Sequence, residues 1–408
     1  MLPGGLWRQP DFLKLWTAQT VSQIGSAISA LGIPLTALYV LHASTRQMGY
    51  LGGAGGVAIL FFGLFAGAWA DRLRRRPILI AADLGRAALL TTIPLAAVYH
   101  RLTMQHLYAI AAATSILTVF FDAGYHAYLP SLVAREQLVE GNSKLALSAS
   151  TAEVAGPALT GALVYRLTGP VAILFDALSF VFSAVCLALI RMPEPQPEPA
   201  PQPHLLKEIG EGLRACWSDP VLRALSLRTA TGSLCLGFIS SLYMPFVVQD
   251  LHVNPVQLGG IVSIGGVSSV LGTFLVAWLL RRFGTGLTLI ASSLTTGFAF
   301  VLVLLAHGSV ARCLFFLGAA QLFDAGWSVF SIAQQSLMQT ITPNHLLGRV
   351  SSALNLLFRG VLPAGAVAGG VLAESFGIRQ TMAAGAIGFL LSTLWLVFSP
   401  VRRIRDFS

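Results

Sequence analysis

Apolar stretches about 20 residues long recur along the whole chain and constrain its fold more than any other feature. About 20 apolar residues are needed to cross a bilayer as a helix. Inside lipid every backbone polar group needs an internal partner, so repeated apolar stretches predict a bundle of helices. A membrane β-barrel would show short alternating segments instead, and the sequence has none. Only 11% of the residues are charged, whereas about 25% is usual in soluble proteins.

Hydropathy predicts twelve membrane-spanning segments, with ends defined to within a few residues. They cover 14–41, 48–70, 78–99, 106–128, 142–165, 169–190, 222–249, 257–280, 286–306, 310–338, 348–373 and 377–398. An even number of spans places both termini on the same side of the membrane.

The distribution of basic residues predicts which side this is. Eighteen of the 26 Lys and Arg residues fall on the side of the termini, and five on the other. Because cytoplasmic loops are the basic ones, we expect both termini in the cytoplasm and a multi-pass protein of the plasma (inner) membrane. A net charge of +9 also suits nucleic-acid binding. However, these residues lie between spans, so no nucleic-acid partner is expected.

A proline-rich segment, RMPEPQPEPAPQP at 191–203, divides the chain. Proline excludes a helix here and favours a stiff, extended linker. Apolar residues at helical spacing follow within 205–217, which predicts a helix lying on the inner membrane surface or a connector packed on protein. The expected domains are an N-terminal six-helix half at 1–190, a cytoplasmic linker with an amphipathic helix at 191–218, and a C-terminal six-helix half at 219–408.

The two sides of the linker repeat each other at an offset of 209 residues. AWADRL at 68–73 aligns with AWLLRR at 277–282, and LVAREQLVEGNS at 132–143 aligns with ITPNHLLGRVSS at 341–352. Several matches at one offset indicate duplication. Two six-span halves joined by a linker are the layout of a parallel-repeat secondary transporter.

Several phrases carry a family resemblance. The loop GAWADRLRRRP at 67–77 has the form G-x-x-x-D-R-x-G-R-[RK], except that Arg74 replaces the second glycine. DLGR at 83–86, LPSLVAREQLVEGNS at 129–143 and GRVSSALNLLFRGVLPAG at 348–365 strengthen the match. With them the chain resembles the major facilitator superfamily, and within it the exporter branch of macrolide-efflux proteins and the enterobactin exporter. The resemblance implies an all-α membrane fold of twelve transmembrane helices in two pseudo-symmetric six-helix halves.

The same resemblance implies roles for two groups of residues. The loop between the second and third spans would act as a conformational latch, formed by Gly67, Asp71, Arg72, Arg75 and Arg76 with Asp83 and Arg86. The fifth span would hold a hinge of the form G-P-x-x-G at Gly156, Pro157 and Gly161. Ordinary close packing of small residues is the alternative for the hinge. Fixing the topology is the alternative for the arginines of the loop.

Ionisable residues inside spans mark candidate functional sites, because each costs roughly 2.5–3.5 kcal/mol at the bilayer centre. The acids are Asp122, Glu153, Asp176 and Asp324, and the best-centred base is Arg359. We expect Asp324 first, then Glu153 and Asp122, to take up a proton or contact cargo, since a poorly hydrated cavity favours the protonated carboxyl. A fixed ion pair with Arg359 or a hydrogen bond between helices is the alternative.

Polar residues on other spans are candidates for the lining of a central cavity. The first span carries Gln19, Gln23 and Ser26, at spacings of four and three residues. The candidates on the seventh and tenth spans are Ser240, Tyr243, Gln321 and Trp327. Polar side chains beside aromatic rings suit an amphipathic ligand, and hydrogen bonding between helices is the alternative.

The sequence favours a secondary active transporter, a proton-coupled exporter of small amphipathic molecules of drug or siderophore type. An uptake carrier on the same fold is the alternative. A membrane enzyme is a remote one, because no HExxH or GxSxG phrase occurs and no phosphate-binding loop is present. The four cysteines show no metal or redox spacing. We therefore expect no cofactor and no metal. The expected partners are a small-molecule substrate, protons and the bilayer, and the expected state is a monomer.

Overall fold

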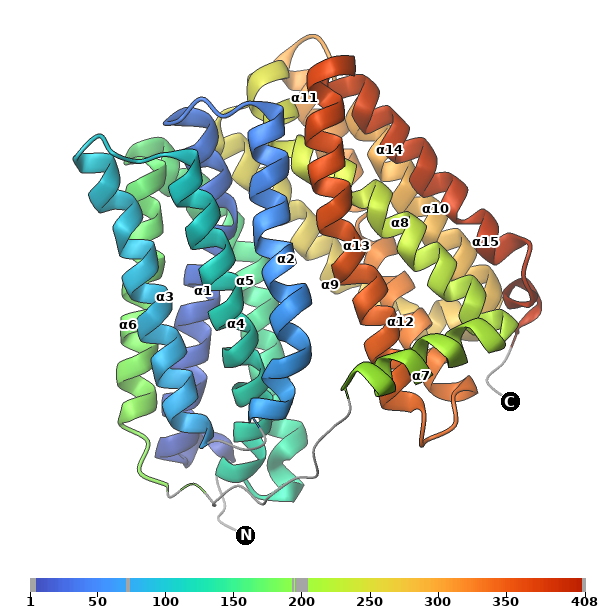
Figure 1. Cartoon of the computed structure of the whole chain (residues 1–408), viewed down its shortest axis with the longest axis horizontal. Coiled ribbons are helices and arrows are strands. Elements are labelled where there is room, and N and C mark those ends of the chain that lie inside the picture. The colour runs from blue at the N-terminus through green and yellow to red at the C-terminus, as the bar shows by residue number, and fades with distance from the viewer. Residues whose placement is uncertain (1–4, 71–73, 193, 195–204, 406–408) are drawn as a thin grey trace. The chain divides into compact units, whose positions relative to one another are not determined.

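The computed structural model describes residues 5–70, 74–192, 194 and 205–405, with the backbone alone at 57–60, 63–70, 126–127 and 205–208. The described chain is helical and contains no strand. It separates into two compact units (Figure 1). Unit 1 comprises Met1–Ala43 and Val57–Gln202, and unit 2 comprises Ser44–Gly56 and Pro203–Ser408.

Unit 1 is built from six long helices and two short 3-10 turns. These are η1 (Leu6–Arg8), α1 (Pro10–Tyr39), α2 (Thr45–Ala70), α3 (Arg75–Val98), α4 (Met104–Leu132), η2 (Arg135–Gln137), α5 (Leu138–Arg166) and α6 (Gly169–Ala188). The first turns of α2, up to Gly56, belong to unit 2. Helix α6 packs against both α1 and α3, and α1 also packs against α5.

Unit 2 begins with the amphipathic helix and continues with the remaining spans. Its elements are α7 (Leu205–Ser218), α8 (Pro220–Pro245), η3 (Phe246–Asp250), α9 (Pro255–Phe283), α10 (Thr285–Leu304), α11 (Val310–Leu322), α12 (Ala325–Ile341), α13 (Leu347–Phe376), α14 (Ile378–Ser392), α15 (Leu394–Val397) and η4 (Pro400–Arg403). Helix α8 packs along α13 and α14.

The helices coincide with the twelve predicted spans. Within the described residues, ten helical segments are long and apolar enough to cross a membrane. Helices α2 and α5 match the other two spans, and α5 is the more polar because it carries Glu140, Lys144 and Glu153. The predicted all-α membrane fold of twelve helices in two halves is therefore confirmed. The span predicted at 310–338 is not continuous, since it divides into α11 and α12 around Phe323 and Asp324.

Polar caps place the helix starts where the chain turns. The side chains of Thr103 and Thr168 accept hydrogen bonds from the first turns of α4 and α6. Asn254 forms a capping box with Gln257 at the start of α9. Each cap satisfies backbone N–H groups that have no partner inside the helix. The helices therefore begin with their polar ends satisfied before they enter apolar surroundings.

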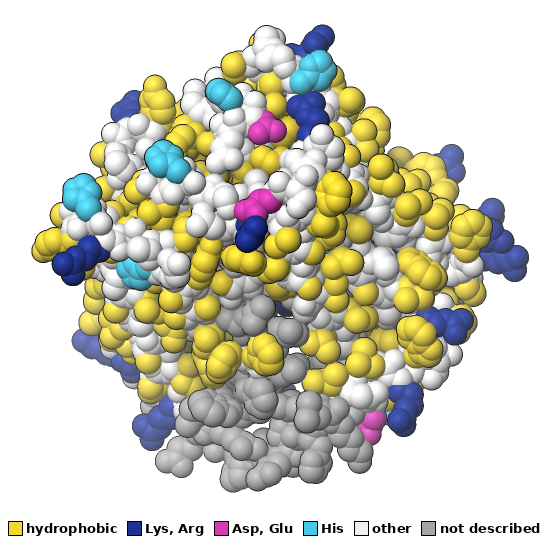
Figure 2. Space-filling model, turned by 45° about the horizontal axis from the view of Figure 1, so that its top comes forward, with side chains coloured by type: hydrophobic (Ala, Val, Ile, Leu, Met, Phe, Trp, Pro, Cys, Tyr) yellow, Lys and Arg dark blue, Asp and Glu magenta, His cyan; other side chains and the backbone are white. Residues whose placement is uncertain are grey.

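The outer surface is hydrophobic, as expected for contact with lipid. On the face in Figure 2, hydrophobic side chains predominate and charged side chains are few. Large apolar residues remain uncovered, including Phe274, which is 77% exposed, and Phe298, which is 49% exposed. Soluble monomers rarely expose apolar area on this scale. This surface fits a protein whose solvent is the bilayer.

The amphipathic helix α7 packs on protein along one side. Cys216 is buried with Val350 and Ala353 of α13, and Glu211 forms an ion pair with Arg349 at 2.6 Å. Trp217, on the same helix, is 61% exposed. The helix therefore packs against α13 and keeps an exposed apolar side chain, so it combines features of both sequence-based alternatives.

Glycines let α8 and α13 approach closely within unit 2. A Cβ atom at Gly365 would lie 2.1 Å from the carbonyl oxygen of Leu234, and one at Gly237 would lie 2.4 Å from that of Leu362. Both distances are shorter than a van der Waals contact, and the atoms that the added Cβ would meet belong to the backbone, which cannot easily move aside. Small residues are the usual means of close approach between membrane helices.

We therefore expect Gly365→Ala to destabilise the protein by about 1–3 kcal/mol, because α8 and α13 must separate. The measurement is the thermal unfolding midpoint of the purified protein, followed by the loss of the monodisperse peak after heating. Gly348→Ala on the same helix is the matched control, since a Cβ there meets nothing within 4 Å. Equal midpoints for the two variants would contradict this account of the contact.

Candidate functional site

The C-terminal end of α6 is capped by cations from two neighbouring helices of unit 1. Arg76, at the start of α3, donates from Nε to the carbonyl of Leu187 at 2.9 Å and from Nη2 to that of Ala188. Lys14 of α1 donates to the next carbonyl, that of Leu189, at 2.8 Å. Positive groups suit this end of a helix because its last carbonyls have no partner and carry negative partial charge.

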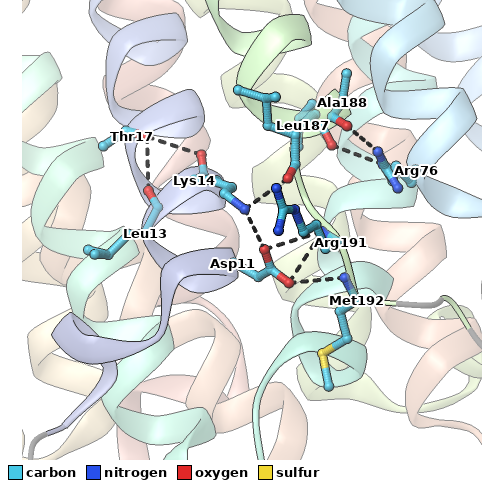
Figure 3. A network of polar contacts seen from close by, with 10 residues as sticks. Asp11, Leu13, Lys14, Thr17, Arg76, Leu187, Ala188, Arg191 and Met192 are labelled. Atoms are coloured by element: carbon cyan, nitrogen blue, oxygen red, sulfur yellow. Dashed lines mark hydrogen bonds and ion pairs between the residues drawn. The ribbon is translucent and has the colours of Figure 1, made fainter.

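Carboxylates bind the backbone N–H groups beside the same helix end (Figure 3). Asp11 accepts from the backbone N–H of Arg191 at 3.2 Å and of Met192 at 3.0 Å, and it forms an ion pair with Lys14 at 2.7 Å. Glu194 accepts from the N–H groups of Arg75 and Arg76 at the start of α3. The stem of the linker is thus fixed to α1 and α3 by charge-assisted hydrogen bonds.

A buried ion pair lies deeper in the same unit, on α3. Asp83 and Arg86 form this pair one helical turn apart. The Arg86 guanidinium lies 4.4 Å from the ring centre of Phe121 and 4.0 Å from that of Phe180. Asp176 of α6 is also buried and interacts electrostatically with Arg86. Together these groups form a polar cluster at the contacts of α3 with α4 and α6.

The predicted hinge residues lie in α5, where it meets α1. A Cβ atom at Gly156 would lie 2.3 Å from the Cβ of Ala27, so this glycine permits close approach. The hydroxyl of Thr160 donates to the carbonyl of Gly156 at 2.8 Å. Pro157 sits inside the helix without ending it, and Gly161 is buried. The element therefore packs α5 on α1 within unit 1.

In unit 2 the break between α11 and α12 brings several predicted residues together. The Gln321 amide points at the hydroxyl of Tyr243, with 3.4 Å between nitrogen and oxygen. A Cβ at Gly265 of α9 would lie 2.1 Å from Oε1 of Gln321 and 3.4 Å from Oδ2 of Asp324. Asp324 thus lies at a helix discontinuity beside an amide and a phenol.

A serine from α9 bridges this discontinuity. Ser268 Oγ donates to the carbonyl of Leu322 at 2.6 Å and accepts from the N–H of Ala325 at 3.1 Å. These two backbone groups lie where the regular helical pattern is interrupted. The hydroxyl therefore supplies the partners that a continuous helix would have supplied.

A small cavity of about 140 Å³ lies in unit 2, between α8, α12 and α13. Trp327, one of the predicted lining residues, borders it together with Gln334 and Gln335. Arg228 of α8 forms part of its wall and is only 4% exposed. Arg228 is not among the candidate site residues that the sequence marks. Its position inside an apolar segment, two turns from the start of the span, was the signal that could have found it.

The helical architecture and the intramembrane polar sites both suit a transporter, and comparison with known proteins decides the family. A family model described as Major Facilitator Superfamily matches residues 15–365. The chain belongs to the major facilitator superfamily.

Two relatives place it near exporters within this superfamily. The chain is 27% identical to the multidrug efflux pump Tap of Mycolicibacterium fortuitum, over 98% of this chain and 97% of Tap. It is 25% identical to macrolide efflux protein A of Streptococcus pyogenes, over 97% of this chain and 96% of that protein. The predicted resemblance to the exporter branch is therefore confirmed.

Solved structures of the superfamily share the fold. A bacterial homologue of the iron transporter ferroportin, in an inward-facing state, matches with a TM-score of 0.76 at 20% identity, covering 97% of this chain and 99% of that one. The nucleoside transporter NupG matches with a TM-score of 0.76 at 14% identity, covering 96% and 98%. At these identities the likeness concerns the fold alone.

The remaining predicted residues of this superfamily member occupy separate places. Asp71 and Arg72 lie outside the described residues, and Gly67 is described by its backbone alone. Asp122 on α4, Glu153 on α5 and Arg359 on α13 are exposed, as are Ser26 and Ser240. Gln19 is buried in α1 and Gln23 is partly buried. Of the predicted cavity-lining residues, Gln321 and Tyr243 meet in unit 2, near Asp324.

The capping of α6 predicts a structural role for one signature arginine. Arg76→Gln removes two donors from the end of α6, so we expect a loss of roughly 1–3 kcal/mol in stability. Thermal unfolding of the purified protein checks this. Arg74→Gln is the control, because Arg74 precedes α3, is exposed and makes no capping hydrogen bond. An unchanged midpoint for Arg76→Gln would show that the cap contributes nothing.

Proposed function

We propose that this superfamily member is a secondary active exporter of small amphipathic molecules, of drug or siderophore type, driven by a proton gradient through alternating access. The observation that carries the proposal is the similarity to two efflux proteins along nearly the whole chain. The proposal includes the plasma (inner) membrane as location, cytoplasmic termini, a monomeric state and no enzymatic activity. It retains the predicted halves at 1–190 and 219–408, joined by the linker at 191–218.

Asp324 is the proposed proton or substrate site. It lies where α11 gives way to α12, beside the Gln321 amide and close to Gly265 of α9. Discontinuous helices are where transporters commonly place their ion and substrate sites. A carboxyl in this setting can exchange a proton, because the surrounding amide and phenol offer hydrogen bonds to either form. Glu153, Asp122 and Arg359 are the further candidates.

The cytoplasmic loop is the proposed latch, and α5 carries the proposed hinge. Arg75 and Arg76 contact Glu194 and α6 within unit 1, which fixes the loop's second half in place. Asp71 would then be the switching group, since its repeat mate at position 280 is a leucine. Helix-end amides favour an anion such as this carboxylate.

Everted membrane vesicles test the function. With the lumen acidified, we expect wild-type vesicles to accumulate a radiolabelled amphipathic drug or siderophore, and to lose it when the pH gradient is collapsed. Accumulation in right-side-out vesicles, with none in everted ones, would favour the uptake carrier. Absence of gradient-dependent movement in both orientations, across a drug and siderophore panel, would contradict proton-coupled transport.

The carboxylate is tested by Asp324→Asn. We expect gradient-driven accumulation to be lost, because the asparagine side chain cannot take up or release a proton. Downhill exchange of the same cargo should persist, because the variant can still bind the cargo. Transport rates are compared across pH 6 to 8 at equal amounts of inserted protein. Glu136→Gln, an exposed acid in η2, is the control. A wild-type pH profile for Asp324→Asn would remove this residue from the coupling mechanism.

Asp71→Asn tests the latch separately. We expect normal insertion and a normal elution profile with impaired export, because the change removes a charge without removing a hydrogen-bonding group. Surface labelling measures insertion, and the everted-vesicle assay measures export. Wild-type export by a normally inserted variant would leave the loop as a topology signal only.

A further inference from the structure

Arg228 is a buried cation that forms no ion pair with any acidic side chain that the structure describes. Its Nε and Nη2 donate to Oγ of Ser293 at 3.3 and 3.0 Å. Its guanidinium lies 3.6 Å from the ring centre of Phe330 and 4.9 Å from that of Phe389. Within the described part of the chain, no acidic side chain lies within ion-pair distance of it.

The buried arginine of unit 1 offers a direct comparison. Arg86 is equally enclosed, at 4% exposed, and also contacts two aromatic rings, but it forms an ion pair with Asp83. Among the described residues, Arg86 therefore has a carboxylate partner, whereas Arg228 has only a hydroxyl and two aromatic rings. A desolvated charge normally requires a counter-charge. Cation–π contacts offset only part of this requirement.

Arg228 borders the cavity and has a hydrogen-bond donor that no described residue uses. Its bonds to Ser293 use Nε and one terminal nitrogen, so Nη1 makes no hydrogen bond to any described residue. The arginine borders the cavity, and it is the one ionisable residue among those described in the wall. The charge presented to the cavity is therefore positive.

The rest of the wall is aromatic and amide-bearing. Trp327 and Phe358 lie with their ring centres 5.6 Å apart, and Phe330 also borders the cavity. Gln335 and Asn355 add neutral hydrogen-bonding groups. The volume of about 140 Å³ is close to that of cavities that hold one benzene ring, about 150 Å³. The walls therefore suit a flat ring that carries a negative group.

We propose that this cavity binds the aryl carboxylate end of the cargo, with the carboxylate on Arg228 and the ring against Trp327 and Phe330. The inference rests on the proposed function, since it names the chemical class of the exported molecule. An arginine fork matches a carboxylate in shape as well as charge. The bound anion supplies the counter-charge that no acidic side chain among the described residues provides.

Equilibrium binding of radiolabelled benzoate and benzamide to the full chain in lipid nanodiscs tests the proposal. The two probes have the same ring and nearly the same size but differ in charge. We expect wild type to prefer benzoate by at least about tenfold, since hydrogen bonds to a charged group contribute about 1.5–3 kcal/mol. Arg228→Gln abolishes the preference and Arg228→Lys retains part of it, with benzamide binding unchanged in both.

The control is Arg223→Gln on the same helix, because Arg223 is exposed and should leave the preference intact. No benzoate preference in wild type, or an unchanged preference in Arg228→Gln, overturns the proposal. Parallel loss of benzoate and benzamide binding in Arg228→Lys, which keeps the charge, also overturns it, because that pattern marks a structural role. Binding needs no proton gradient, so failure of gradient-driven transport in vesicles and failure of anion selectivity are separate results.

Discussion

Backbone N–H and C=O groups must find partners within apolar surroundings, and the rest of this structure depends on that requirement. Inside each helix the partners are supplied by the helix itself, so the helix ends become the critical places. Asn254 caps the start of α9 through its side chain. At the end of α6, three successive carbonyls are bound by Arg76 and Lys14 from two other helices. The ion pairs and caps near the linker thus complete the secondary structure and fasten neighbouring helices together.

The buried charges away from helix ends are each enclosed by a specific set of neighbours. Asp83 and Arg86 neutralise each other between aromatic rings, and Asp176 accepts a hydrogen bond from Ser179. Arg228 has rings and a hydroxyl alone. The two units therefore treat buried charge differently. Unit 1 contains its own counter-charges, whereas unit 2 presents a cation at a cavity wall, which is where a charged ligand would be recognised.

The spans could be predicted to within a few residues because hydropathy depends on composition along the chain and not on which helices are neighbours. The grouping of side chains could not be predicted in the same way. Asp122 and Asp324 occur in the same phrase, FDAG. Yet Asp122 is exposed on α4, whereas Asp324 lies in a turn. The family motif indicated Arg76 as a site residue. Its hydrogen bonds to α6 could not be predicted, because they depend on how α3 and α6 pack. Arg228 was missed as a site residue because no motif marks it.

At most positions of a membrane-spanning helix an apolar replacement is tolerated, but at Ser268 it is not. At the exposed positions of α9, such as Leu271 and Phe274, another apolar residue would be tolerated, since the surroundings are lipid. At position 268 the same change would strip two backbone groups in the α11–α12 turn of their partners. In a saturation mutagenesis scan, tolerance at this position should therefore follow hydroxyl content and not hydrophobicity, so that threonine is accepted where alanine and valine are rejected. The break between α11 and α12 at Asp324 thus depends on a hydroxyl side chain at position 268 of α9.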